Sequence, residues 1–451
     1  MDLKEVHRVY FIGIGGIGMS AIAKYFSING KQVAGYDKTP SDITSSLSDV
    51  GASIHFEDAL HLIPQDFKDP EGTLVVYTPA VPKEHKQLNF FFEQGFVTLK
   101  RAQVLGEITK NTFCLGVAGT HGKTTTSSIL GHVMKVCNTG ATSFLGGVTE
   151  NYNSNLIEGE DAISVVEADE FDRSFLQLSP DVACVTSMDA DHLDIYGEKE
   201  ALEASFKEFS SKVTQQLIVC KGLPLKGLTY AIEEEADYTA YDIKIEDGAY
   251  RFSVKTPKAN LSNVLFHLPG RHNLSNALAA IAMAEQYGLS LEEIAAALAS
   301  FKGVKRRFSY KIKREDFVLI DDYAHHPTEI DAVVDAVREM YPNEEVLAVF
   351  QPHLFSRTKD FIDDFARSLS RFDALLLLDI YPARELPISG VNSKWLLDKI
   401  SIDNKHLLQK KDVFNALQKF DTRVVVMLGA GDIGVLIEEV KREFESTLNE
   451  R

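Results

Sequence analysis

One segment of the sequence reads TFCLGVAGTHGKTT, from Thr112 to Thr125. An apolar run suited to a β-strand leads into a glycine-rich loop, and a lysine and two threonines then open a helix. The N–H groups of such a loop can surround phosphates, Lys123 can reach terminal phosphates, and the Thr124 hydroxyl can bind Mg²⁺. The pattern GxxxxGK[ST] is off by one place, since Val117 stands where its first glycine belongs. A structural turn with a solvated lysine is the alternative, but the order of these features favours phosphate binding.

Two strand-like runs that follow end in acidic residues. Ala162–Val166 leads into Glu167, and Val182–Thr186 is soon followed by DADHLD, which contains His192. Ligands of open α/β sheets bind at the carboxyl ends of strands, so Glu167 is a candidate Mg²⁺ ligand. A capping acid is the alternative for Glu167. His192 is either a metal ligand or a structural histidine.

Two later segments of this part of the chain are also candidates for nucleotide contacts. The segment GRHN begins an alanine-rich helix, and its Asn273 can contact a nucleobase or cap the helix. The basic run from Lys305 to Arg307 can hold phosphate or be exposed linker charge.

The N-terminal part repeats the strand–glycine–helix pattern in RVYFIGIGGIG, from Arg8 to Gly18. A second strand, Gln32–Tyr36, ends at Asp37, and an acid at that place commonly binds a ribose hydroxyl. The pattern indicates a nucleotide or its diphosphate, with tight helix–strand packing as the alternative. The glycines concerned are Gly13, Gly15, Gly16 and Gly18.

In the C-terminal part, three strand-like runs end in polar clusters. Phe317–Ile320 leads into DDYAHHPTE, Val346–Phe350 into QPHLFSRT, and Leu375–Ile380 into YPARE. We interpret these clusters as one wall of an active-site cleft. A further strand, Val424–Leu428, precedes GAGDIG, which has no lysine and is either a phosphate loop or a tightly packed turn.

The regular alternation of strands and amphipathic helices predicts an α/β fold with mostly parallel sheets. At roughly 150 residues per domain, a chain of 451 residues suggests about three domains. Polar stretches near Glu107–Lys110 and Lys311–Arg314 mark the boundaries. We expect a Rossmann-like domain over residues 1–108, a central P-loop-type, ATPase-like domain over 109–312, and a second Rossmann-like domain over 313–451.

Composition excludes several classes of protein. A formal net charge of −18 argues against non-specific nucleic-acid binding. The four cysteines have no CxxC spacing, so neither a disulfide framework nor a zinc site is expected. The chain has no run of 18 apolar residues, and its N-terminal segment does not resemble a signal peptide. We therefore expect a cytoplasmic protein that does not enter the membrane.

Taken together, the motifs resemble those of the Mur ligases of bacterial cell-wall synthesis, and their order from Gly13 to Glu385 is the family order. The off-pattern phosphate loop is itself typical of that family. The most similar branch is the one that adds L-alanine to UDP-N-acetylmuramate. The segments that carry the resemblance are GIGGIGMSAIA, GVAGTHGKTTT, EADEFDRSFLQLSP, DADHLDIYG, GRHNLSNALAA, DDYAHHPTE, FQPHLFSRT and YPARE.

The resemblance implies an ATP- and Mg²⁺-dependent ligase of peptidoglycan synthesis, a monomer or weak homodimer. It implies that the four N-terminal glycines bind the UDP-sugar with Asp37, Thr78 and Arg101. The residues it implies for ATP are Gly119, Thr120, His121, Gly122, Lys123, Thr124, Thr125, Asn273, Arg307 and Asp322. It implies Thr124, Glu167 and His192 for the metal, and Tyr323, His325 and Arg357 for the amino acid. Lys123, Glu167, His192 and His325 would be catalytic, with His325 the best candidate for the general base.

Two positions depart from the family pattern. Many Mur ligases have a carbamylated lysine where this chain has Phe206, with Lys207 beside it. The alanine-adding branch also lacks that lysine, and what replaces its negative charge stays open. Leu354 stands where some relatives have an arginine near the amino-acid carboxylate, so Arg357 would carry more of that binding.

Three alternatives stay open from the sequence. One is the recycling ligase of the same family, which attaches a tripeptide to the same UDP-sugar. A second is a nicotinamide-dependent oxidoreductase, which explains the N-terminal glycines but not Lys123 or Glu167. The third is a nucleotide-binding regulator without catalytic activity.

Overall fold

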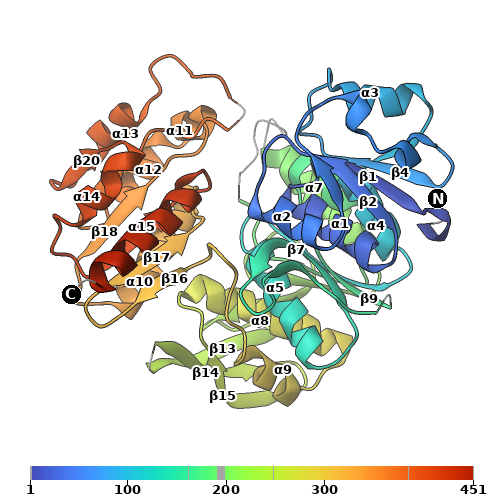
Figure 1. Cartoon of the computed structure of the whole chain (residues 1–451). Helices are drawn as coiled ribbons and strands as arrows, with labels where there is room; N and C mark the ends of the chain where they lie inside the picture. The colour runs from blue at the N-terminus through green and yellow to red at the C-terminus, as the bar shows by residue number, and fades with distance from the viewer. Residues whose placement is uncertain (1–2, 161, 190–198, 247, 384, 450–451) are drawn as a thin grey trace. The chain divides into compact units, whose positions relative to one another are not determined.

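The computed structural model describes residues 3–160, 162–189, 199–246, 248–383 and 385–449 (Figure 1). The described residues form three β-sheets. The chain divides into two compact units. The first unit contains the first two sheets apart from the β13–β14 turn region, and the second contains the third sheet. The first comprises Met1–Ile243, Arg251–Phe266 and Ser275–Lys302, and the second comprises Lys244–Tyr250, His267–Leu274 and Gly303–Arg451.

The first sheet has five parallel strands in the order β3-β2-β1-β4-β5. Alternate residues of β1 enter opposite cores, because side chains along a strand point to alternating faces. Val9 and Phe11 are buried in one core and Tyr10 and Ile12 in the other. The strands are β1 Arg8–Ile12, β2 Gln32–Tyr36, β3 Ser53–His55, β4 Thr73–Tyr77 and β5 Val97–Lys100. The helices are α1 Ile17–Ile28, α2 Asp42–Asp49, α3 Lys86–Glu93 and α4 Arg101–Thr109, with short 3-10 helices at Leu3–Glu5, Leu60–Leu62 and Gln65–Lys68.

The second sheet has ten strands in the order β15-β14-β13-β12-β11-β10-β6-β9-β7-β8. Its strand β6 lies between β10 and β9 and is parallel to both. Helix α5 follows β6, and its residues from Thr124 to Met134 are all buried, which fixes the loop between the two elements. The strands are β6 Phe113–Ala118, β7 Thr142–Thr149, β8 Ser154–Ile157, β9 Ile163–Glu167, β10 Val182–Val185, β11 Gln216–Cys220, β12 Leu228–Ile232, β13 Tyr238–Glu246, β14 Ala249–Lys255 and β15 Asn260–Phe266. The helices are α5 Lys123–Val136, η4 Phe171–Gln177, α7 Lys199–Ser211, α8 Arg271–Tyr287 and α9 Leu291–Leu298.

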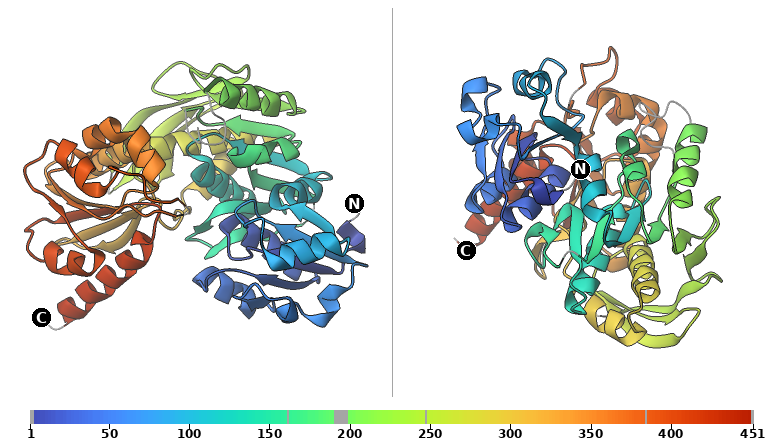
Figure 2. Two further views of the ribbon diagram at one scale, coloured as in Figure 1. Left: turned by 90° about the horizontal axis from the view of Figure 1, so that it is seen from above. Right: turned by 90° about the vertical axis from the view of Figure 1, so that its right-hand side faces the viewer.

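The third sheet has six strands in the order β16-β17-β21-β18-β19-β20, and only its edge strand β16 pairs in the antiparallel direction. Helices α10, α12 and α13 pack on one face, and α14 and α15 pack on the other (Figure 2). The strands are β16 Ser309–Lys313, β17 Val318–Asp322, β18 Val346–Phe350, β19 Ala374–Leu377, β20 Lys405–Leu407 and β21 Val424–Leu428. The helices are α10 Pro327–Met340, α11 Phe355–Asp360, α12 Ile362–Leu369, α13 Ser393–Lys399, η5 Lys410–Asp412, α14 Val413–Leu417 and α15 Ile433–Asn449.

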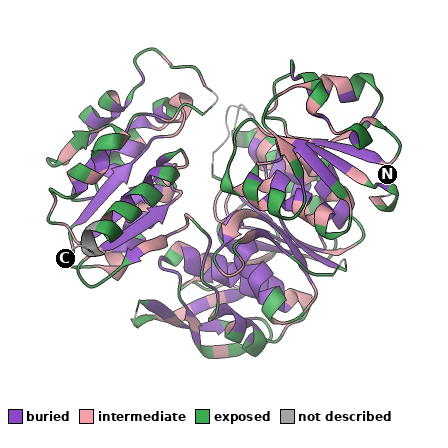
Figure 3. Ribbon diagram, in the orientation of Figure 1, coloured by how far each residue is buried: buried purple, intermediate pink, exposed green. Residues whose placement is uncertain are grey.

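Burial follows the expected layering. The sheet strands are largely buried, while the helices alternate between buried and exposed faces (Figure 3). Among the described helices, none combines the length and apolar character needed to cross a bilayer.

The structure confirms the predicted α/β class with mostly parallel sheets and all three strand–glycine–helix segments. Several predicted strand ends were wrong by one to three residues. Strand β9 includes Glu167 and β17 includes Asp321 and Asp322, so these acids lie inside strands rather than after them. The reason is that their carboxylates find partners within the fold, which removes the cost of burying them. Strand β19 ends at Leu377, three residues before the predicted end.

Candidate active site

The loop between β6 and α5 depends on two glycines. Gly119 has φ +139° and Gly122 has φ +81°, conformations that residues with a Cβ rarely adopt. A Cβ on Gly119 would lie 2.1 Å from Thr186 Oγ1, and one on Gly122 would lie 2.5 Å from Asn276 Oδ1. Both positions therefore require glycine for conformation and for space.

Ser187, just past β10, holds this loop from the side. Its hydroxyl accepts the His121 N–H at 2.7 Å, and its carbonyl accepts the Thr120 N–H at 3.2 Å. The Thr120 hydroxyl accepts the N–H of Asp189 at 3.0 Å, and His121 Nε2 lies 3.5 Å from the carboxylate of the same aspartate. Thr125, in the first turn of α5, is buried. The loop is thus fixed by Ser187, which the sequence did not single out, and by Asp189 of the DADHLD segment.

Lys123, the first residue of α5, is paired with a buried carboxylate. Its Nζ lies 2.7 Å from Glu170 Oε2 and 2.9 Å from Oε1, and it donates to the Gly119 carbonyl at 2.5 Å. Burial alone would lower the pKa of Lys123, but Glu170, Asp169 and Glu167 outweigh it and raise the pKa. Lys123 is therefore a firmly protonated ammonium at the mouth of the glycine loop.

Beside Lys123, two oxygen-bearing side chains meet. The Thr124 hydroxyl donates to Glu167 Oε1 at 2.9 Å, and the N–H of Gly146 donates to Glu167 Oε2 at 2.9 Å. A hydroxyl and a carboxylate are ligands that Mg²⁺ prefers. The third predicted metal residue, His192, lies outside the described residues.

The segment after β9 has an unusual backbone. Asp172 and Arg173 have φ of +53° and +54°, and the left-handed conformation costs about 1–2 kcal/mol per residue with a side chain. Lys100 Nζ lies 2.8 Å from Asp172 Oδ2, and Arg101 Nη2 lies 2.9 Å from Asp169 Oδ2. Ion pairs from the start of α4 therefore hold this strained segment.

The glycine turn of the first sheet gathers its predicted partners at the carboxyl end of β1. The N–H of Gly15 donates to Asp37 Oδ2 at 2.7 Å, so this acid fixes the turn itself. A Cβ on Gly13 would lie 2.7 Å from Thr78 Cγ2, and one on Gly18 would lie 2.7 Å from Arg101 Nη1. The neighbouring Gly16 caps helix α1, which begins at Ile17. Thr78 and Arg101 thus border the glycine turn.

A contact from the second sheet supports the same turn. The Asn155 side-chain amide, near the start of β8, donates to the Ile17 carbonyl at 2.6 Å and to the Ser20 hydroxyl at 2.8 Å. Sequence reasoning gave no sign of Asn155, because its partner lies far away in the chain.

At the start of α8, Asn273 makes a local contact. Its side-chain amide donates to the Pro269 carbonyl at 2.6 Å, and the residue is buried. One turn later, Asn276 borders Gly122 of the phosphate loop. Sequence reasoning missed Asn276, although it stands in the same quoted motif.

In the second unit, Asp322 ends β17 with both carboxylate oxygens occupied. Oδ2 accepts the N–H of Phe308 and Oδ1 accepts that of Ala324, each at 2.7 Å. Burial raises the pKa of Asp322 from its ordinary value of 3.8 to about 6, although Arg307 opposes the rise. Arg306 and Arg307 lie over the Tyr323 ring, 5.0 and 5.2 Å from its centroid.

His325 follows the same strand end. Its Nδ1 lies 2.9 Å from the Tyr323 carbonyl and 3.2 Å from Glu329 Oε2. Two oxygen neighbours place the proton on Nδ1, which leaves the Nε2 lone pair free to accept a proton. Burial lowers the pKa of His325, and Arg357 also lowers it, so the ring is neutral at pH 7.

Leu354 caps the short helix α11 that carries Arg357. It has φ +72°, and its N–H donates to the Tyr381 carbonyl at 2.9 Å while its carbonyl accepts the Thr358 hydroxyl at 2.8 Å. These two bonds hold the strained backbone at the start of α11. Both bonds use backbone atoms of residue 354, so they do not explain why leucine stands at this position.

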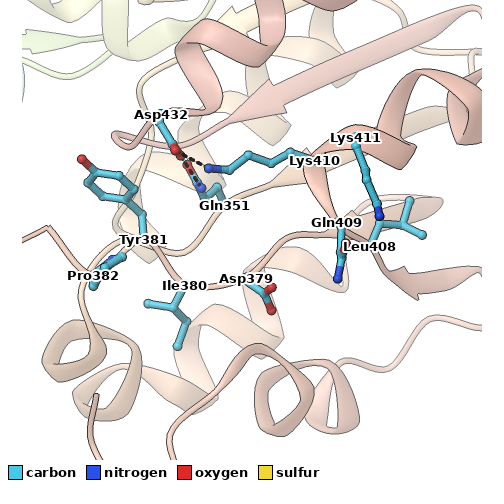
Figure 4. Close-up of a pocket in the computed structure, with 10 residues that line it drawn as sticks. All are labelled: Gln351, Asp379, Ile380, Tyr381, Pro382, Leu408, Gln409, Lys410, Lys411 and Asp432. Atoms are coloured by element: carbon cyan, nitrogen blue, oxygen red, sulfur yellow. Dashed lines mark hydrogen bonds and ion pairs between the residues drawn. The ribbon is translucent and has the colours of Figure 1, made fainter. Parts of the chain in front are cut away.

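The GAGDIG motif follows β21, and the sequence left it as either a phosphate loop or a tightly packed turn. The structure shows a tightly packed turn. A Cβ on Gly431 would lie 2.5 Å from Gln351 Oε1, which also accepts the Ile433 N–H at 3.0 Å. Gln351 Nε2 donates to Asp432 Oδ1 at 2.8 Å, and Lys410 pairs with the same carboxylate (Figure 4). These residues border a cavity of about 500 Å³. Gln351 thus occupies one backbone N–H group of this turn, that of Ile433.

The position of the missing carbamylated lysine is apolar. Phe206 is fully buried and packs edge-on against Phe175 at 5.3 Å, and Phe209 stacks on the same ring at 5.0 Å. Lys207 is exposed. No charge replaces the carbamate at this place in the described fold.

Comparison with known proteins adds to this geometry. Residues 8–112 match the model "Mur ligase family, catalytic domain", residues 117–284 "Mur ligase middle domain", and residues 306–436 "Mur ligase, glutamate ligase domain". UDP-N-acetylmuramate–L-alanine ligase of Flavobacterium psychrophilum is 61% identical over 447 residues, which cover 99% of this chain and 100% of that protein.

Two solved structures are also similar. UDP-N-acetylmuramate–alanine ligase from Thermotoga maritima has a TM-score of 0.84 and 26% identity, and the match covers 98% of this chain and 99% of that one. A murein peptide ligase from Psychrobacter arcticus has a TM-score of 0.69 at 22% identity, over 96% of this chain and 98% of that one, which indicates a shared fold alone.

Proposed function

The chain belongs to the Mur ligase family, and we propose that it ligates L-alanine to the carboxylate of UDP-N-acetylmuramate with ATP. The products are ADP, phosphate and UDP-N-acetylmuramoyl-L-alanine, a precursor of peptidoglycan. The observation that carries this proposal is the 61% identity, over the full length, to a relative with that name. The glycine loop and Lys123 supply the phosphate chemistry that such a reaction needs.

The chemistry divides into two steps. The UDP-sugar carboxylate attacks the γ-phosphate of ATP, which gives an acyl phosphate and ADP. The alanine amine then attacks the acyl carbon and expels phosphate, because phosphate is a much better leaving group than hydroxide. The protonated Lys123 and the loop N–H groups stabilise the charge on the transferring phosphoryl group.

The described residues Thr124 and Glu167 fit a Mg²⁺ ion, since their hydroxyl and carboxylate oxygens are hard donors 2.9 Å apart. They would hold the ion together with His192. When bound, Mg²⁺ neutralises charge on the phosphates. Replacing Glu167 by Gln should weaken the binding of the Mg²⁺–ATP complex in calorimetry, and unchanged affinity would contradict the assignment.

His325 is the candidate that takes a proton from the alanine ammonium. Its Nε2 lone pair is free, and its lowered pKa keeps the ring neutral at pH 7. Because the pKa is lowered, the acid limb of the rate with L-alanine should lie below pH 6.5, the ordinary value. An acid limb that His325→Gln leaves unchanged would exclude this role. Tyr323 and Arg357 are the neighbouring groups proposed for the amino acid.

In the first sheet, the proposed site for the UDP diphosphate is the glycine turn with Thr78 and Arg101. Gly13 and Gly18 leave space beside these side chains, and the start of α1 adds a favourable dipole. Asp37 is bonded to the Gly15 N–H and would act by shaping the turn. For ATP, Asn273, Arg307 and Asp322 stay proposals.

The assay that tests the proposed function measures ADP release with UDP-N-acetylmuramate and a panel of amine substrates. We expect release with L-alanine, and a much lower rate with the murein tripeptide. Preference for the tripeptide would favour the recycling ligase. Binding of a fluorescent nicotinamide cofactor would favour the oxidoreductase, and absence of ADP release with every amine would favour the inactive regulator.

We also propose a cytoplasmic location, where ATP and UDP-sugars are found, and a monomer or weak homodimer. Fractionation of cells and sedimentation over a range of concentrations test these two points. A stable large oligomer or a membrane-bound form would contradict them.

A further inference from the structure

Arg101, the first residue of α4, faces two elements with the two edges of its guanidinium group. Its Nη1 edge borders the glycine turn, since a Cβ on Gly18 would lie 2.7 Å from that atom. Its Nη2 edge donates to Asp169 Oδ2 at 2.9 Å. Asp169 follows β9 of the second sheet, so this one side chain joins the glycine turn of the first sheet to the acidic segment of the second.

Asp169 has its second oxygen bound as well. Its Oδ1 accepts the N–H of Phe171 at 3.1 Å, and its carbonyl accepts the N–H of Phe175 at 2.8 Å. The carboxylate is thus oriented by its own segment, and it presents Oδ2 to Arg101. A small cavity of about 10 Å³ is lined by Arg101, Asp169 and Glu167, which puts this ion pair next to the proposed metal residue.

The next residue, Glu170, holds the phosphate-loop lysine. Both of its oxygens lie within 2.9 Å of Lys123 Nζ, and its carbonyl accepts the N–H of Arg173 at 2.9 Å. Adjacent residues of one segment therefore hold Arg101 on one side and Lys123 on the other.

The same segment carries a second ion pair to the start of α4, between Lys100 and Asp172 at 2.8 Å. Asp172 and Arg173 are both left-handed, an arrangement that persists only where surrounding contacts hold it. We define residues 169–173 as the acidic strap. Lys100 at the end of β5, Arg101 at the start of α4 and Lys123 of α5 all anchor this strap.

We propose that Asp169 is a positioning residue: it fixes Arg101 for the UDP-sugar, and through the acidic strap it couples the UDP-sugar site to Lys123 at the ATP site. The inference rests on the proposed function, because it uses the two substrates named there. A diphosphate at the glycine turn would fix the Nη1 edge of Arg101 and thereby stabilise the Asp169 contact and the strap. If the UDP-sugar thereby improves the binding of ATP, linkage requires that ATP improve the binding of the UDP-sugar by the same factor.

The test is calorimetric and needs no turnover. The affinity for UDP-N-acetylmuramate is measured with and without a non-hydrolysable ATP analogue and Mg²⁺. For the unmodified protein, we expect the analogue to tighten binding about fivefold or more. Asp169→Asn keeps the size of the side chain but removes its charge, and it should weaken UDP-sugar binding about tenfold and bring the coupling factor close to one.

The matched control is Asp69→Asn. Asp69 lies between the 3-10 helix Gln65–Lys68 and β4, pairs with Arg8 of β1 at 3.4 Å, and is remote in sequence from the acidic strap. This variant should keep both the affinity and the coupling. Asp169→Glu restores the charge and should recover part of the coupling, which a merely structural loss would not do.

Arg101→Ala gives a second route if Asp169→Asn fails to fold. It should abolish the effect of UDP-N-acetylmuramate on the affinity for the ATP analogue, although Arg101 is not proposed as an ATP ligand. The losses of Arg101→Ala and Asp169→Asn should not add in the double variant. If the unmodified protein binds both ligands, then wild-type coupling in Asp169→Asn, or additive losses, overturns this inference alone. If it binds neither ligand, the proposed function fails, and this inference falls with it.

Discussion

Lys123 lies between a buried carboxylate and the backbone of its own loop, 2.7 Å from Glu170 Oε2 and 2.5 Å from the Gly119 carbonyl. An ammonium held in this way is already positioned to contact the terminal phosphates of ATP. Lys123→Ala should therefore lower the rate of ADP release by about 100- to 1,000-fold, in line with the loss of one positioned group that stabilises a transition state.

Lys135 provides the control for that measurement. It lies on the same helix, is exposed, and donates to the Glu158 carbonyl at 2.8 Å. Lys135→Ala should leave ADP release within about twofold of normal, since surface substitutions remote from a site have small effects. Near-normal turnover in Lys123→Ala would contradict the assignment of the phosphate loop.

Asp322 gives a prediction for stability against pH. Its pKa is raised from 3.8 to about 6, so the folded protein retains this proton over a range in which the unfolded chain releases it. The contribution of Asp322 to stability is therefore present below pH 4 and is lost as the pH rises to about 6. The shift corresponds to a loss of up to about 3 kcal/mol.

Asp322→Asn removes that titration. The difference in unfolding free energy between the natural protein and the variant should shrink by up to about 3 kcal/mol between pH 4 and 7. The single tryptophan, Trp395, lies in the second unit and reports urea unfolding there. A difference that stays constant with pH would refute the raised pKa.

Single residues were predictable where one motif names both the residue and its chemistry, as for Lys123, Thr124 and Glu167, although their roles stay proposals. Ser187, Glu170 and Asn276 were not recognised, because each acts on a loop that lies far away in the chain. The sequence feature that could have identified Glu170 is its position three residues after Glu167, the candidate metal ligand.

At the scale of elements, the phosphate loop requires backbone shapes that only glycine supplies. Gly122→Ala would place a Cβ 2.5 Å from Asn276 Oδ1 at φ +81°. We expect a loss of stability of about 1–2 kcal/mol from the left-handed backbone, together with loss of ATP-analogue binding. Thermal unfolding and calorimetry measure the two effects separately.

Gly222→Ala is the matched control for this change. Gly222 has φ +94°, and its Cβ would meet no atom within 4 Å. The Gly222→Ala variant should lose about as much stability as Gly122→Ala but keep its affinity for the ATP analogue. Equal loss of binding in both variants would mean that general destabilisation, rather than the loop, explains the result.

Elements were predicted well where they are long or strongly patterned. Strands β2, β18 and β21 have the predicted bounds. The ends of the strands at Glu167 and Asp322 were predicted wrongly, because a charged residue suggests the surface unless its partner is known. Each of these carboxylates accepts an N–H group from a distant segment, that of Gly146 or that of Phe308. The left-handed pair at Asp172 and Arg173 has no sequence signal at all, since neither residue is glycine.

At the scale of the whole molecule, the net charge of −18 coexists with proposed sites for two polyanions. Net charge governs non-specific association, whereas backbone N–H groups and single cations act over a few ångströms. Lys123 and Arg101 are each held by a carboxylate, so part of the acidic excess positions the cations that anions need.

The three sheets follow from the three strand–glycine–helix segments, and the α/β class was predictable for that reason. The division into two compact units was not predictable. The first unit joins two sheets through contacts such as that of Asn155 with Ile17. Such contacts leave no local pattern in the chain.

The central claim is that the UDP-sugar carboxylate is activated by phosphorylation and then captured by L-alanine. The most direct measurement uses UDP-N-acetylmuramate with ¹⁸O in its carboxylate, together with ATP, Mg²⁺ and L-alanine, and analyses both products by mass spectrometry. We predict an alanyl amide and inorganic phosphate that has acquired one ¹⁸O atom from the carboxylate. Phosphate without ¹⁸O, or ADP formed without the amide, would contradict the account.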